Sequence, residues 1–229
     1  MIHETPFISY LVTCKNDGKS IWPLLNLLNF TKDNFSCECV ILDDFSDDQE
    51  TLSILDEVNF NRKGFFKVSK HHLDNHYSNH KNYGKSLCSG KWIFQIDSDE
   101  LPAETLLLNL KDIIETNPMV ELFWVPRIND FRGVNQENAR QWGWRLTQYE
   151  DRFIVNWPDP QTRIFLNTPR IKWERPLHEK VEGAMISTHL PHEYEFSLHH
   201  NKTIQKQIET NIRYNRDFSE ELNRGHILK

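Results

Sequence analysis

The chain has 229 residues, a length that fits one domain or one domain with an appendage. Its net charge of −6 gives no support to bulk nucleic-acid binding, which needs a concentrated basic surface. Seven Trp, six Tyr and fourteen Phe argue against disorder. No apolar stretch approaches the roughly 20 residues of a membrane span, and the first residues do not resemble a signal peptide. We therefore expect a cytoplasmic protein whose four cysteines are reduced.

The first hundred residues alternate short apolar runs with segments in which apolar residues recur at helical spacing. We expect Ser20 to cap the first helix, and Asp47 or Asp48 to cap the second. Alternation of this kind is typical of an α/β fold with a parallel sheet and helices on its faces. The expected strands are 7–12, 39–42, 64–68 and 91–96, and the expected helices are 20–30, 50–58 and 76–88.

The second half of the chain alternates less regularly. The stretch 126–162 is rich in Trp, Arg, Asn and Pro and is expected to be irregular. The tail, 202–222, is expected to be a highly charged helix with a solvated surface. Before residue 126 we expect a helix from Pro102 to about residue 116 and a strand at 120–125, and after residue 162 a strand at 163–166.

Asp97, Ser98 and Asp99 directly follow the strand expected at 91–96 and precede a helix. In an extended segment residues i and i+2 point the same way, so both carboxylates should face one site. Two carboxylates at a strand end fit Mg²⁺ or Mn²⁺, which take waters and phosphate oxygens as further ligands. A solvated acidic turn or a helix cap is the alternative, but the position directly after an apolar strand favours the metal site.

A second acidic cluster begins with Asp43 and Asp44, after the strand expected at 39–42. A carboxylate at a strand end can accept a hydrogen bond from a base imide or a ribose hydroxyl. Helix capping is the alternative, but Asp43 and Asp44 come too early for the helix expected at 50–58. Ligands of open α/β sheets lie beyond the carboxyl ends of the strands, so both acidic clusters should border one crevice.

Two segments in the first fifty residues, 7–16 and 40–48, resemble those of the family 2 glycosyltransferases of the GT-A fold. Residues 7–16 are similar to the opening strand, whose Thr and following residues touch the nucleotide base. Residues 40–48 are similar to the VDDxSxD segment, whose second Asp meets the base. A departure is Lys15, where many members carry Tyr.

The later segments resemble one branch of that family, the lipopolysaccharide core glucosyltransferase-like branch. Residues 81–84 and 89–100 are similar to its KN…xDxDE run. Residues 156–165 and 176–179 are similar to its W-x-P-D-x-Q-x-R-L-F and H-E blocks. The ordered resemblance extends over roughly residues 7–200.

The resemblance implies a GT-A type α/β fold: a single Rossmann-like, mostly parallel sheet with helices on both faces and a C-terminal helical tail. The chain, 1–229, is then one glycosyltransferase domain. Residues 1–100 form its nucleotide-binding half, 101–200 its acceptor-side half and 201–229 its helical tail.

The resemblance also implies the reaction. An acceptor hydroxyl, on a glycan or another molecule, attacks the anomeric carbon of a nucleotide-diphosphate sugar with inversion, assisted by Mn²⁺ or Mg²⁺. Asp99 and His178 are the implied metal ligands and Glu179 the implied general base, although a His-Glu pair alone is more often a surface feature. Arg163 is either a diphosphate clamp or a surface arginine. The residues implied at the donor are Thr13, Lys15, Asp43, Asp44, Lys81, Asp97 and Arg163.

Two other functions remain open at this point. A nucleotidyltransferase uses a similar sheet and paired Asp residues, but it normally shows a Gly-rich loop after the first strand, and residues 13–18 hold a single Gly. A catalytically inactive module that binds a nucleotide or a sugar is the other alternative. The presence of Asp97, Asp99 and Glu179 argues against it.

Overall fold

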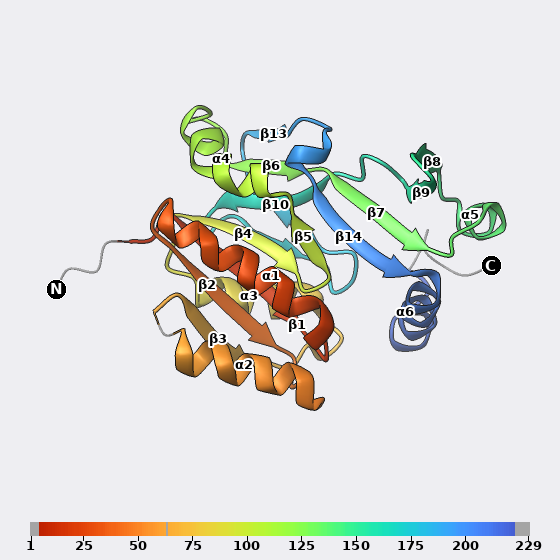
Figure 1. The fold of residues 1–229 in the computed structure, drawn as a ribbon, viewed down its shortest axis with the longest axis horizontal. Coiled ribbons are helices and arrows are strands. Elements are labelled where there is room, and N and C mark those ends of the chain that lie inside the picture. Colours follow the sequence, from red (N-terminus) through yellow and green to blue (C-terminus); the bar gives the residue numbers. More distant parts are fainter. Residues whose placement is uncertain (1–4, 63, 223–229) are drawn as a thin grey trace.

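The computed structural model describes residues 5–62 and 64–222, and Figure 1 shows them as a mixed α/β fold built around one large sheet. The helices and strands expected in the first hundred residues are all found, with ends shifted by a few residues. Residues 223–229 of the expected tail lie outside the described residues.

The large sheet has seven strands in the order β13-β6-β10-β4-β1-β2-β3. Strands β1 to β4 pair in parallel, whereas β10 is antiparallel to its two neighbours. All of β1 except Thr13 is buried, as expected of a parallel strand that is covered on both faces. A mostly parallel α/β sheet is thereby confirmed. Its strands are β1 (Ile8–Cys14), β2 (Cys37–Asp43), β3 (Phe66–Lys70), β4 (Trp92–Asp97), β6 (Leu122–Val125), β10 (Gln161–Leu166) and β13 (Ser187–His189).

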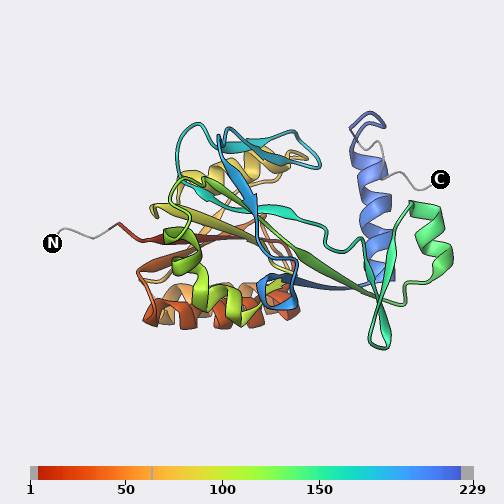
Figure 2. The same cartoon turned by 90° about the horizontal axis from the view of Figure 1, so that it is seen from above.

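Helices lie on both faces of this sheet (Figure 2). On one face, Ile8, Tyr10 and Val12 pack in a core with apolar side chains of α1, α2 and α4. On the other face, Leu11 belongs to a second core, which is covered by α3 and the β11–β12 hairpin. The elements of these layers are α1 (Gly18–Phe30), η1 (Thr31–Asp33), α2 (Gln49–Asn61), α3 (Tyr77–Ser86), α4 (Glu104–Glu115), β11 (Lys172–Glu174) and β12 (Lys180–Glu182).

The helix starts confirm one expected cap and correct the other. The Asp48 carboxylate accepts a hydrogen bond from the Thr51 backbone N–H at 2.9 Å, so Asp48 caps α2. Helix α1 begins at Gly18, and Asp17 occupies the capping position. The expectation that Ser20 caps this helix is therefore wrong.

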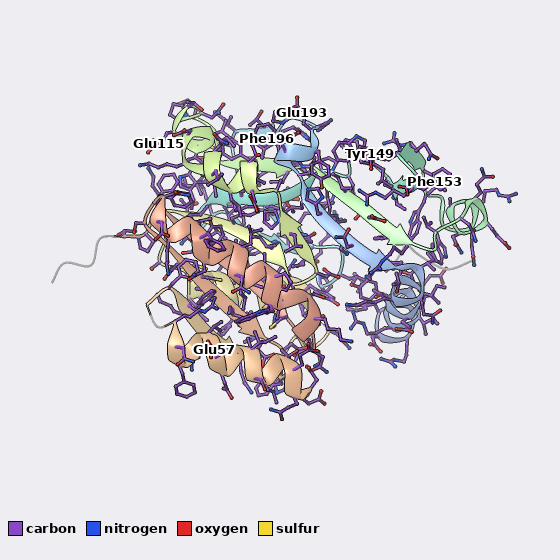
Figure 3. All side chains as sticks on the ribbon, viewed as in Figure 1. Glu57, Glu115, Tyr149, Phe153, Glu193 and Phe196 are labelled. Atoms are coloured by element: carbon purple, nitrogen blue, oxygen red, sulfur yellow. The ribbon has the colours of Figure 1, made fainter. Side chains whose placement is uncertain are left out.

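The expectation that 126–162 is irregular is also wrong. This stretch forms β7 (Arg127–Arg132), α5 (Gln136–Trp142), β8 (Leu146–Tyr149) and β9 (Arg152–Val155). The three strands belong to a second, five-stranded sheet with the order β5-β14-β7-β9-β8, so the large sheet is not the single sheet that was predicted. The hairpin β8–β9 lies at the outer edge of this second sheet, where Figure 3 labels Tyr149 on β8 and Phe153 on β9.

The second sheet brings the segment after Asp99 beside the C-terminal tail. Strand β5 (Glu100–Pro102) pairs with β14 (Leu198–Thr203), and His200 lies opposite Glu100 in the register. The short helix η2 (Tyr194–Phe196) precedes β14. Helix α6 (Ile204–Asp217) follows β14 directly and lies beyond the carboxyl ends of β1 and β2 (Figure 1). His199 and Leu101, which are far apart in the chain, thus lie opposite each other in this sheet.

We predict that Gly90→Ala destabilises the sheet. A Cβ at position 90 would lie 2.5 Å from the Ser9 backbone nitrogen and 2.7 Å from the Ile8 carbonyl carbon, so β1 must shift. Overpacking of this kind costs about 1–3 kcal/mol. Urea unfolding of both proteins measures the loss, and an unchanged midpoint would show that β1 does not constrain this position.

Candidate active site

The carboxyl ends of β1, β2 and β4 border a cavity of about 440 Å³. The chain segments after these strands line it together with α3, β14 and α6. Both predicted acidic clusters contribute, because Asp44, Asp97 and Asp99 all lie in the lining. The prediction that the two clusters face one crevice is therefore confirmed.

Asp97 is held by cations. Its Oδ2 lies 2.7 Å from Arg163 Nη2, and its Oδ1 lies 3.3 Å from Lys81 Nζ. Burial raises the pKa of Asp97, but the charges of Arg163 and Lys81 outweigh it and hold the pKa well below its usual range. The Gln95 side-chain amide also donates to Oδ1 at 2.8 Å, and the Thr13 hydroxyl at 3.3 Å. Asp97 is thus an ionised carboxylate whose oxygens already have partners.

Arg163 lies beneath the cavity rather than in its lining. Its side chain is 6% exposed, and Nη2 lies 2.5 Å from the Glu100 carboxylate as well as 2.7 Å from Asp97. Gln95 accepts a further hydrogen bond from Nη1. Arg163 is therefore neither a surface arginine nor placed as a diphosphate clamp, since its guanidinium is used to neutralise buried Glu100 and partly buried Asp97.

Asp99 has a different partner, His200. His200 Nε2 lies 3.4 Å from Asp99 Oδ2, and His200 Nδ1 lies 2.8 Å from Asn129 Oδ1. The Asn129 amide nitrogen donates to Asp159 at 2.7 Å and to the Val155 carbonyl at 3.2 Å, which fixes Oδ1 toward the histidine. His200 therefore donates through Nδ1 to Asn129, and its Nε2 is directed at Asp99.

This arrangement keeps Asp99 ionised. Burial raises the pKa of Asp99. The hydrogen bond and charge of His200 lower it by more than burial raises it, so the pKa lies well below its usual range. Lys202 contributes in the same direction. A carboxylate oxygen and an imidazole nitrogen 3.4 Å apart are a donor pair that can bind one cation.

His178, the other implied metal ligand, is not brought to Asp99. Its residue adopts a left-handed backbone conformation, with φ of 52°, and it does not line the cavity. Its ring lies edge-on to Tyr214, with 6.1 Å between the centroids. The residue beside Asp99 is His200, which the sequence did not single out because only the pairing of β5 with β14 brings it there.

Glu179 lies in the cavity lining, next to Lys81. Lys81 Nζ is 2.6 Å from Glu179 Oε1, and the lysine side chain is only 6% exposed. Burial lowers the pKa of Lys81, but Asp97 and Glu179 outweigh it and raise the pKa above its usual value. Lys81 is therefore a buried ammonium that joins the two predicted acids, Asp97 and Glu179.

The two aspartates after β2 have separate environments. Asp44 accepts from the Leu73 backbone N–H at 2.9 Å and from Lys15 Nζ at 3.0 Å, and it lies in the cavity lining. Asp43 is fully buried outside the lining and accepts from the Ser46 backbone and hydroxyl at 3.0 and 2.6 Å. Asp43 thus closes the loop after β2, and of the two only Asp44 can meet a ligand in the cavity.

The tail contributes to the cavity, in contrast to the expectation of a solvated helix. Lys202, Lys206 and Arg213 all lie in the lining. Arg213 Nη2 lies 3.4 Å from the Tyr77 hydroxyl, and the rings of Tyr77 and Tyr214 pack edge to face with centroids 6.1 Å apart. Contacts with α3 therefore hold α6 against the site.

The described residues contain no cluster of three or more His, Cys, Asp or Glu side chains arranged to bind a metal. The donor pair of Asp99 and His200 nevertheless fits Mn²⁺ or Mg²⁺, because such ions commonly take one or two protein ligands and complete their shell with waters and phosphate oxygens. No helix within residues 5–62 and 64–222 has the length and apolar character of a membrane span.

The sequence model of glycosyl transferase family 2 matches residues 9–168. The chain belongs to this family. No curated protein matches the chain.

The solved structures are similar in fold. The complex of S. aureus TarS 1-349 with UDP-GlcNAc superposes with a TM-score of 0.59 at 20% identity, over 85% of this chain and 58% of that one. The complex of TarS 1-349 with UDP gives a TM-score of 0.58 at 20% identity, over 93% and 67%. This family 2 chain thus has the GT-A fold, and it spans about three fifths of the length of the first of these relatives.

We predict that Arg163→Met strongly destabilises this family 2 domain. Glu100 is fully buried and would be left with Arg127 at 3.0 Å, and Asp97, whose side chain is 34% exposed, would be left with Lys81 at 3.3 Å. Removing one partner of a buried pair costs about 3–5 kcal/mol in unfolding free energy. Arg170→Met is the matched control, because Arg170 is 40% exposed and its pair with Glu121 should contribute at most about 1 kcal/mol. Equal losses in urea unfolding would contradict this assignment.

Proposed function

We propose that the protein transfers a sugar from a nucleotide-diphosphate sugar to an acceptor hydroxyl, with inversion at the anomeric carbon and the help of a divalent metal. The observation that carries this proposal is the presence of Asp44, Asp99 and Glu179 in one cavity at the edge of the sheet. Family membership supports it, and so does the fold shared with TarS, which has been crystallised with UDP-GlcNAc and with UDP. The ordered blocks at 156–165 and 176–179 support the lipopolysaccharide core glucosyltransferase-like branch.

We assign the nucleotide base to the side of the cavity formed by the ends of β1 and β2. Asp44 keeps its backbone partner Leu73 and shares one oxygen with Lys15, which is half exposed and can move. Thr13, at the end of β1, lines the same wall. A carboxylate in this place can accept from a base N–H or a ribose hydroxyl when Lys15 turns away.

We assign the metal to Asp99 and His200 rather than to Asp99 and His178. Asn129 fixes the His200 ring so that Nε2 is directed at Asp99, an arrangement typical of metal-binding histidines. A divalent ion held there would neutralise the negative charge that develops on the departing diphosphate. Asp97, whose oxygens are bound by Arg163 and Lys81, is assigned to positioning and to the donor ribose.

We assign the proton transfer to Glu179. As the acceptor oxygen bonds to the anomeric carbon, the bond from that carbon to the phosphate oxygen breaks and the hydroxyl proton passes to a carboxylate. The ion pair with Lys81 uses Glu179 Oε1 and holds the side chain in place, so Oε2 is the oxygen assigned to accept the proton. Glu104 and Asp159, the other acids considered for this role, do not line the cavity, and Asp159 is paired with Arg127 at 2.7 Å.

The direct test of the proposed function is the fate of a labelled donor. The protein is incubated with Mn²⁺, mixed acceptor glycans and nucleotide sugars labelled in the sugar, and the products are separated. Transfer of the label with release of a nucleoside diphosphate supports the proposal. When pyrophosphate is added instead of acceptor, its consumption with formation of a nucleoside triphosphate and a labelled sugar 1-phosphate would indicate a nucleotidyltransferase. Tight binding without turnover would indicate an inactive binding module.

We predict that His200→Gln and Asp99→Asn abolish the Mn²⁺-dependent thermal stabilisation by nucleoside diphosphates, whereas His178→Gln retains it. The reason is that His200 Nε2 lies 3.4 Å from Asp99 Oδ2, with its ring held by Asn129. A ligand at a hundred times its Kd contributes about 2.7 kcal/mol, which a thermal-shift assay resolves. The reverse pattern, with His178→Gln losing the response, would return the metal to His178.

We predict that Glu179→Gln transfers sugar about 10²–10⁴-fold more slowly while binding the donor normally. The amide keeps the shape of the side chain but cannot accept the proton. Glu182→Gln, an exposed change on β12, is the matched control and should leave turnover unchanged. Single-turnover kinetics measure the chemical step, and a parental rate for Glu179→Gln there would place the base elsewhere.

A further inference from the structure

The tail supplies cations to the cavity that the described carboxylates do not neutralise. Three other lining cations have close acidic partners: Lys15 pairs with Asp44 at 3.0 Å, Lys81 with Glu179 at 2.6 Å, and Arg127 with Asp159 at 2.7 Å. Within residues 5–62 and 64–222, no carboxylate oxygen lies within 4.0 Å of the charged nitrogens of Lys202 or Arg213. Two positive charges therefore point into the cavity without an ion-pair partner in the described part of the chain.

The position of these two cations is fixed by the fold. Lys202 lies on β14 two residues after His200, so it is on the same side of the strand as the proposed metal ligand. Arg213 lies on α6, where it contacts the Tyr77 hydroxyl and where Tyr214 and Phe218 pack on the Tyr77 ring. Both cations are thus presented by ordered elements of the chain.

Lys206 belongs to the same wall but is partly neutralised. Its Nζ lies 3.7 Å from Asp17 Oδ1, a distance that leaves it able to turn toward an anion. Asp17 in turn accepts from the Ser98 hydroxyl at 2.6 Å, which ties the start of α1 to the segment between Asp97 and Asp99. The tail therefore meets the nucleotide-binding half of the domain at this point.

We propose that Lys202 and Arg213 bind the diphosphate of the donor, so that α6 and the end of β14 complete the donor site. This inference rests on the proposed function. A diphosphate esterified at both ends carries two negative charges, which two cations balance, and an arginine can bind phosphate oxygens through two parallel hydrogen bonds. The family match covers residues 9–168, and Lys202 and Arg213 lie beyond it.

Binding of inorganic pyrophosphate in the presence of Mn²⁺ tests the inference without knowledge of the donor base. Isothermal titration should show about tenfold or greater weakening in Lys202→Gln and in Arg213→Gln, because each removes a charge-assisted hydrogen bond. Arg216→Gln is the matched control: it lies on the same helix, is 72% exposed and pairs with Asp217. It should bind pyrophosphate like the parent.

The outcomes separate this inference from its premises. Parental affinity in both Lys202→Gln and Arg213→Gln would overturn it. Weakening in Arg213→Gln alone would also overturn it, because loss of the Tyr77 contact and loosening of α6 would then explain the effect. Unchanged pyrophosphate binding by both variants of a protein that transfers sugar contradicts this inference alone. Weakened binding by both variants of a protein that transfers no sugar contradicts the proposed function alone.

Discussion

The site depends on a buried charge network in which two cations hold three carboxylates. Arg163 contacts Asp97 and Glu100, and Lys81 contacts Asp97 and Glu179. Parallel strands bring their acidic ends to one edge of the sheet, where these carboxylates would repel one another in a poorly hydrated environment. The two cations remove that repulsion and leave each acid in a defined position. Asp99 contacts neither of these two cations but lies 3.4 Å from His200, and this is the pair that we propose for the metal.

The same constraint explains how a chain with a net charge of −6 can bind an anionic donor. Acidic side chains near the cavity are neutralised internally, by Lys15, Lys81, Arg127 and Arg163. The charge that remains for a ligand is the proposed metal on one side and the tail cations on the other. The net charge of the chain therefore does not predict whether the cavity binds an anion, because the charges that line the cavity determine this.

Much of this account could be predicted from the sequence, and the parts that could not share one cause. Asp44 and Asp99 could be placed at the site because each follows a strand whose pattern is local and clear, whereas Lys81 and Glu179, which also line the cavity, were expected there from the family resemblance. His200 was missed because only the pairing of β14 with β5 brings it beside Asp99. The strands of 126–162 were missed for a similar reason: β7 is short and largely polar and is held by pairing with β14, some 70 positions away in the chain. Arg163 was ambiguous because a sequence does not show whether an arginine meets buried carboxylates or a ligand.

The measurement that tests the central claim most directly is the anomalous scattering of manganese in crystals grown with Mn²⁺ and a nucleoside diphosphate. The account predicts one manganese peak, bound by an Asp99 oxygen and His200 Nε2 and by phosphate oxygens, with Asp97 still paired to Arg163. It also predicts the diphosphate between that ion and the side chains of Lys202 and Arg213. A manganese peak on Asp97 or His178, or a diphosphate bound by Arg163, would contradict it.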